Sequence, residues 1–235
     1  MNKNPLINVC CEIRFDSKQN ESDVCNLLKD CINKKHLFKT NFVQQEVIKL
    51  PEEVRNQSGH LKCSPHYVIE EDSRVLGVGP HVLLMGTECY QGIGDFSSFV
   101  KEGMDVLREC NINSVNQIRL VYINRIDDSI AKSTNLHISI NDESVKLNDD
   151  YTFHIEYEMS ENCRIALRIC NNNAYIPGKD DESSFSVVDL RAKYDIRDSS
   201  EIYDKLIEAH DYIKTVFKKV MNQEYMKTKW GLNEL

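Results

Sequence analysis

The residues best suited to chemistry in this sequence are charged side chains within two strongly apolar stretches. Glu12 and Arg14 lie in the opening stretch, whereas Arg119, Asn124 and Arg125 lie near the middle of the chain. Guanidinium groups form paired hydrogen bonds with carboxylates and phosphates, so they suit an anionic ligand. They also need partners when they are buried, because an unpaired buried charge is strongly unfavourable. We expect either an anion-binding site or an internal ion-pair network.

Two predicted strands position these side chains. Alternation of apolar and polar residues predicts a strand over Leu6–Phe15 with Glu12 and Arg14 on its polar face. Residues 118–126 are the strongest strand candidate, because β-branched and aromatic residues dominate them. Alternation there places Arg119 and Arg125 on one face and Asn124 on the other, so the two arginines with Glu12 form the centre of the predicted site.

Other motifs give weaker indications of chemistry. His60, Cys63 and His66 have a spacing that could serve zinc, but a site needs a fourth ligand or a supported open position. The Gly-x-Gly turns lack the third glycine of dinucleotide loops, and no phosphate-loop sequence occurs. No cysteine or serine lies in a recognisable nucleophile signature. We therefore expect no catalytic residue, no metal and no cofactor.

Several remaining polar residues have a simpler structural interpretation. His154, Glu156 and Glu158 share one face of a predicted strand and could do acid–base chemistry, but the alternation favours a solvated face. His210 lies beside the apolar stripe of the last predicted helix and is expected at its boundary. Trp230, the only tryptophan, is expected to anchor the polar tail on the body or on a second protein.

Composition narrows the class of protein. The chain has 235 residues, of which 41% are hydrophobic and 28% charged, as in ordinary globular proteins. A net charge of −8 argues against general nucleic-acid binding, which depends on cationic surfaces. No apolar run is long enough for a membrane span, and the start of the chain has no targeting pattern. Nine cysteines, an odd number, are expected to be reduced core residues of a cytoplasmic protein.

The order of predicted elements favours an α+β fold. We expect predominantly antiparallel strands in two strand-then-helix halves, residues 1–127 and 128–235, which share one sheet or form two facing sheets within one compact unit. Asp95 is predicted to cap the helix that precedes the central strand. Residues 127–134 are predicted to be a loop. A long C-terminal helix, capped at Asp198, is expected to reach Tyr225 and to pack on the sheet.

Some of these residues resemble a known family. Pro5 and Leu6 lead into Glu12-Ile13-Arg14-Phe15, and the central strand contains Tyr122-Ile123-Asn124-Arg125-Ile126. In these motifs the chain resembles a sporadically distributed family of uncharacterised, predominantly bacterial proteins, whose central motif is Arg-Tyr-Ile-Asn-Arg-Ile. Val121 stands in place of the first arginine, whereas Asp189 and His210 match late positions of the family. The resemblance covers nearly the whole chain and implies no particular activity.

Two hypotheses for function follow. The first is a non-catalytic ligand-binding or protein-interaction module, with an anionic small molecule, a protein partner or a second copy of the chain as partner. Under this hypothesis, the module works together with the product of a neighbouring gene in a toxin–antitoxin-like or phage-defence system. The alternative is an enzyme that acts on a phosphorylated or carboxylated small molecule in a sheet-lined pocket, using Arg119, Arg125 and Glu12.

Overall fold

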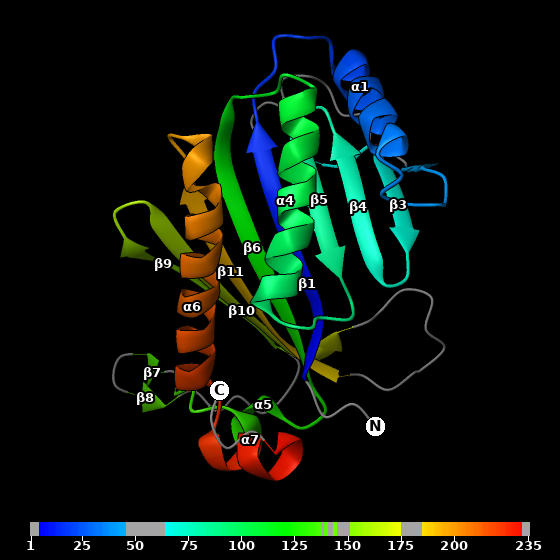
Figure 1. Ribbon diagram of the computed structural model, residues 1–235. Helices are drawn as coiled ribbons and strands as arrows, with labels where there is room; N and C mark the ends of the chain where they lie inside the picture. The colour runs from blue at the N-terminus through cyan, green and yellow to red at the C-terminus, as the bar shows by residue number, and fades with distance from the viewer. Residues whose placement is uncertain are drawn as a thin grey trace. The chain divides into compact units, whose positions relative to one another are not determined.

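The computed structural model describes residues 5–45, 64–137, 139–140, 143–144, 151–174 and 185–231 (Figure 1). Its principal element is a nine-stranded antiparallel sheet with the order β2-β3-β4-β5-β1-β6-β11-β10-β9. A separate two-stranded sheet contains β7 and β8. The predicted α+β class and antiparallel sheet are therefore confirmed.

The strands and helices have the following bounds. The strands are β1 (Leu6–Phe15), β2 (Val43–Gln44), β3 (Tyr67–Glu71), β4 (Arg74–Gly79), β5 (Val82–Thr87), β6 (Val115–Ile126), β7 (Ser139–Ile140), β8 (Glu143–Ser144), β9 (Tyr151–Ser160), β10 (Cys163–Ala174) and β11 (Phe185–Asp195). The helices are α1 (Glu21–Lys34), α4 (Ile93–Glu109), α5 (Ile130–Ser133), the short 3-10 helix η1 (Ser199–Glu201), α6 (Ile202–Val220) and α7 (Gln223–Trp230).

The chain divides into two compact units, each built from separate segments. Unit 1 contains Met1–Asn8, Val121–Ala192 and Ala209–Leu235, whereas unit 2 contains Val9–Leu120 and Lys193–Glu208. Strands β1, β6 and β11 contribute residues to both units. The expected division into halves at residue 127 stays a prediction.

In unit 2, helices cover one face of the sheet. β5 pairs with both β1 and β4 in antiparallel register, and α4 packs on β5 while α1 packs on β4 and on α4 (Figure 1). The alternation of β1 places Val9, Cys11, Ile13 and Phe15 in the core. Glu12 and Arg14 therefore lie on the opposite face of β1, as the sequence predicts.

The start of α4 differs from the expectation for Asp95. The N-cap is Gly92, whose φ of 120° is a conformation that side chains rarely adopt, and no side chain caps the helix. Asp95 lies instead in the first turn, where its carboxylate is 3.6 Å from the guanidinium of Arg74. The predicted cap was wrong because the chain enters the helix at a glycine turn that precedes Asp95.

Two predicted element boundaries in unit 1 were wrong. The last helix was expected to run to Tyr225, but α6 ends at Val220 and α7 begins after Asn222. The Asn222 side chain accepts a hydrogen bond from the Tyr225 amide, so a strong N-cap residue starts a new helix. The predicted loop before residue 134 also contains α5, whose first amide, at Ile130, donates to the buried Asn171 side chain.

Other predictions about single residues are confirmed. The Asp198 carboxylate accepts a hydrogen bond from the Ser200 amide at the start of η1, as expected for a cap. Cys11, Cys25 and Cys110 are buried and free of disulfides, whereas the exposed Cys89 shows that the expectation of core positions was wrong for that residue. None of the helices in the described ranges combines the length and apolar character that crossing a membrane requires.

Candidate functional site

The candidate site, called here the Glu12 cluster, consists of Glu12, Arg14 and Arg119. Arg14 follows Glu12 by two residues on β1, so the two side chains leave the same face of the strand. Arg119 lies on β6, the neighbour of β1 in the strand order. All three residues belong to unit 2.

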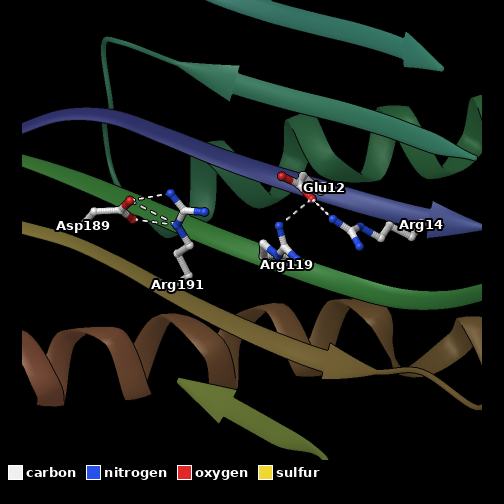
Figure 2. Close-up of polar contacts among 5 residues, drawn as sticks. All are labelled: Glu12, Arg14, Arg119, Asp189 and Arg191. Atoms are coloured by element: carbon white, nitrogen blue, oxygen red, sulfur yellow. Dashed lines mark hydrogen bonds and ion pairs between the residues drawn. The ribbon is translucent and has the colours of Figure 1, made fainter. Parts of the chain in front are cut away.

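One carboxylate oxygen connects the cluster. Arg14 Nη2 donates to Glu12 Oε2 at 3.0 Å, and Arg119 Nη1 lies 3.3 Å from the same oxygen. Figure 2 shows the Glu12 carboxylate reached by both guanidinium groups. The cluster therefore contains two positive charges and one negative charge, all meeting at a single point.

The cluster lies at the border between core and solvent. The side chains of Arg14, Glu12 and Arg119 retain 14%, 19% and 11% of their full exposure, respectively. At such a depth the attraction between the charges is stronger than at a free surface, and an unsatisfied donor is unfavourable. Arg14 Nε is buried and has no hydrogen-bond partner within the described part of the chain.

Arg125 and Asn124 do not join this cluster. Arg125 Nε donates to Asp127 at 2.7 Å, and its guanidinium lies over the Phe185 ring, 4.5 Å from the centroid. Asn124, which is only 4% exposed, donates from Nδ2 to the Val188 carbonyl at 3.1 Å. Both residues thus have partners within unit 1.

A second acid–arginine pair, which the sequence analysis did not assign to a site, lies on β11. Arg191 donates from Nε to Asp189 Oδ1 at 3.0 Å and from Nη2 to Oδ2 at 2.5 Å (Figure 2). The Asp189 side chain is 6% exposed, so this paired contact is well shielded from water. The sequence contains a pattern that could have indicated this pair, since Asp189-x-Arg191 repeats the spacing of Glu12-x-Arg14.

Unit 2 also contains a hollow that the sequence analysis did not predict. It has a volume of about 420 Å³ and lies against α4 and the start of α6. Lys101 and Arg108 line it together with hydroxyl groups that include those of Ser98 and Ser200. Arg108 is already paired with Asp105 at 2.9 Å. This groove is a second position where an anion could bind.

The remaining motifs take structural roles where the structure describes them. His60 and Cys63 of the predicted zinc motif lie outside the described residues, which include only His66. In the described part of the chain, no three His, Cys, Asp or Glu side chains are placed to hold one metal ion. His154, Glu156 and Glu158 are exposed, as expected for a solvated strand face.

His210 and Trp230 are both tied to unit 1. His210 Nδ1 lies 2.7 Å from the Tyr122 hydroxyl. Burial lowers the pKa of His210, and the nearby Lys214 acts in the same direction. The Trp230 ring stacks near Phe217 with 6.3 Å between centroids, so the tail is anchored on the body, one of the two outcomes expected.

Comparisons with known proteins provide no family assignment, since no protein-family model and no curated protein matches the chain.

Proposed function

We propose that the protein is a non-catalytic binding module that holds a small anionic molecule at the Glu12 cluster. The observation that supports this most directly is the sharing of one carboxylate oxygen by the guanidinium groups of Arg14 and Arg119. Such an arrangement places two guanidinium groups beside each other on a half-buried face, where their donors would attract a carboxylate or phosphate group.

The unsatisfied donor of Arg14 supports a ligand more than a purely structural network. A network that serves only stability would place an acceptor at each buried donor, because a buried donor without a partner costs about 1–3 kcal/mol. Arg14 Nε has no such acceptor among the described residues. An oxyanion beside the cluster would provide one.

The proposed role is binding rather than catalysis. Glu12, Arg14 and Arg119 supply charge and hydrogen-bond donors, and none of the three is a nucleophile in this arrangement. Arg125, which the enzyme alternative needs in the same pocket, is held by Asp127 within unit 1. We also propose a cytoplasmic location and, from the resemblance to a bacterial family, a partner encoded by a neighbouring gene in a defence setting.

The experiment is anion-dependent thermal unfolding at constant ionic strength. Phosphate and citrate should raise the melting temperature of the unsubstituted protein above its value in chloride. Arg14→Gln and Arg119→Gln should each abolish this rise. Arg164→Gln removes an exposed arginine, which pairs with Glu158 at 3.6 Å, and should leave the rise intact.

The Glu12→Gln variant distinguishes an anion-binding cluster from a cluster of ion pairs that only stabilises the fold. Without the carboxylate, Arg14 and Arg119 repel each other, so stability in chloride should fall by about 1–3 kcal/mol. Phosphate should then restore more stability than it adds to the unsubstituted protein. The proposal fails if the three cluster variants respond to phosphate as the unsubstituted protein does. It also fails if Arg108→Gln alone removes the response, because the anion would then occupy the groove.

A further inference from the structure

Strand β9 presents a long open edge. It has ten residues and stands at the end of the strand order, with β10 as its neighbour on the inner side. Within the described residues, no strand pairs with its outer edge. At the other end of the order, β2 has only two residues. A long edge with unpaired backbone groups is a template for another strand, and natural proteins usually shorten or cover it.

One face of β9 continues a buried apolar row. Ile155 lies opposite Leu167 of β10, and Tyr157 lies opposite Ile165. The β10 residues are 4% and 0% exposed, whereas Ile155 and Tyr157 are 43% and 36% exposed. The apolar layer of unit 1 therefore extends to β9 but is not covered there, so a further strand with apolar residues on this face would bury it.

The other face of β9 carries charges that β10 balances only in part. Glu158 lies 3.6 Å from the guanidinium of Arg164. The register of β10 places Ala166 opposite Glu156 and Arg168 opposite His154. His154 and Glu156 are both exposed, and neither faces an opposite charge directly across on β10. An added strand could supply the missing partners.

We propose that two copies of this chain pair through β9, antiparallel and two-fold symmetric, with Ile155 of one copy opposite Ile155 of the other. This register places His154 of each copy opposite Glu156 of the other, on the polar face. It places Phe153 opposite Tyr157 on the apolar face. The partner is therefore a second copy, because the strand is complementary to itself in charge and in apolar pattern.

Neighbouring registers are less favourable. Centring the pair on Glu156 would place two glutamates directly opposite each other, and centring it on His154 would pair two histidines. Like charges that face each other across strands are destabilising. A shift by one residue would place Ile155 opposite a charged residue, because side chains alternate between faces. The Ile155-centred register alone gives two His–Glu pairs and no like-charge pair among His154, Glu156 and Glu158.

A charge exchange tests the partner and the register together. His154→Glu replaces two His–Glu pairs with two Glu–Glu pairs and should raise the dissociation constant of the dimer about tenfold. Glu156→His should also weaken the dimer, by placing histidines opposite each other. The double variant restores His opposite Glu and should regain the original dissociation constant. Analytical ultracentrifugation over a dilution series measures each value, and circular dichroism checks that these exposed substitutions leave the fold intact.

Cysteine cross-linking gives an independent measure of the register. Only the residue on the two-fold axis faces its own copy, so Ile155→Cys should give a cross-linked dimer with a short bifunctional thiol reagent. His154→Cys and Glu156→Cys, whose two copies lie on a diagonal about 7–8 Å apart, should cross-link less than Ile155→Cys. Cross-linking at His154 or Glu156 instead would overturn the register. A chain that stays monomeric, or a dimer unaffected by the charge changes, would overturn the pairing through β9.

Discussion

The Tyr122 hydroxyl and the His210 imidazole are 2.7 Å apart, and this hydrogen bond joins residues 88 positions apart, on β6 and α6. The two rings also touch, with 5.8 Å between their centroids. Tyr122 is 7% exposed and His210 is half-buried, so the hydrogen bond is largely shielded from water. A neutral imidazole can accept a hydrogen bond from the phenol hydroxyl at Nδ1, and burial favours this neutral form.

The first prediction concerns the pH dependence of stability. Because the pKa of His210 in the folded protein lies below its ordinary value of 6.5, the unfolded chain takes up this proton first as the pH falls. The stabilisation is therefore complete above pH 6.5 and is lost as the pH falls through the folded pKa. His210→Asn should flatten this part of the pH profile in urea unfolding. His36→Asn, which changes an exposed histidine, should leave the profile unaltered.

The second prediction isolates the hydrogen bond itself. Tyr122→Phe keeps the ring and removes the hydroxyl, so at pH 8 it should lower the free energy of unfolding by about 0.5–1.5 kcal/mol. Combined with His210→Asn, the loss should be smaller than the sum of the two separate losses, because both changes break the same bond. Additive losses would show that the two residues act separately.

The third prediction uses Trp230 to report on α7. The Asp128 carboxylate accepts hydrogen bonds from the Tyr225 hydroxyl at 3.1 Å and from Lys229 at 3.0 Å, and the Lys229 bond lowers its pKa. Asp128→Ala should free the last helix, shift Trp230 emission to longer wavelength and cost about 0.5–1.5 kcal/mol. Asp127→Ala should leave the emission unchanged, since Asp127 pairs with Arg125.

Acid should produce the same change without a substitution. The folded pKa of Asp128 is depressed, so its contribution is present above the unfolded pKa near 3.8 and is lost as the pH falls through the folded value. The Trp230 shift should therefore begin below pH 3.8 in the unsubstituted protein and be absent from Asp128→Ala. An equal acid shift in the variant would contradict the assignment.

The fourth prediction compares two glycines. A Cβ at Gly79 would lie 2.5 Å from the Ser64 carbonyl oxygen and 2.8 Å from Val82 Cγ1, so the backbone itself would have to move. Gly79→Ala should therefore cost about 1–3 kcal/mol. At Gly94, in the first turn of α4, nothing lies within 4 Å of the added carbon. Gly94→Ala should leave stability equal or raise it by up to about 1 kcal/mol.

The fifth prediction concerns thiol reactivity. Burial raises the pKa of Cys25 to about 11 and the pKa of Cys110 to about 12, so both thiols are protonated at pH 8. Cys89 is exposed. Iodoacetamide at pH 8 should modify Cys89 quickly and should reach Cys25 and Cys110 only after denaturation. Peptide mass spectrometry resolves the sites, and early modification of Cys110 would contradict its burial.

Local patterns predicted the strands better than the helix ends. The alternation of β1 and the apolar run of β6 were sufficient to predict both strands and the faces of their side chains, because side chains alternate in direction along a strand. The starts of α4 and α7 depend on which of several nearby residues becomes the N-cap. Gly92 replaced the expected Asp95, and Asn222 interrupted a continuous apolar stripe. Tertiary contacts decide which residue caps the helix, and these contacts cannot be derived from local sequence patterns.

The candidate site was predictable only in part. The sequence predicts that Glu12 and Arg14 share a face of their strand. The local sequence of a strand does not indicate which distant strand pairs with it. The sequence analysis grouped Glu12 with both Arg119 and Arg125, and only the structure shows that Arg119 is the one in contact with it. Arg125 shares a face with Arg119 but finds a partner two residues away, at Asp127. Arg119 and Arg125 are separated by about 20 Å of extended strand, which one carboxylate cannot bridge.

The interleaving of the two units has a consequence for synthesis of the chain. Unit 2 combines Val9–Leu120 with Lys193–Glu208, so it cannot close until the ribosome has released residues far beyond its main segment. Unit 1 waits longer, because it needs Ala209–Leu235 as well. Each unit therefore combines a segment that is synthesised early with one that is synthesised late, so neither can complete its contacts while its main segment emerges. In a nascent chain, β9 is therefore synthesised before Ala209–Leu235, the segment that completes its own unit.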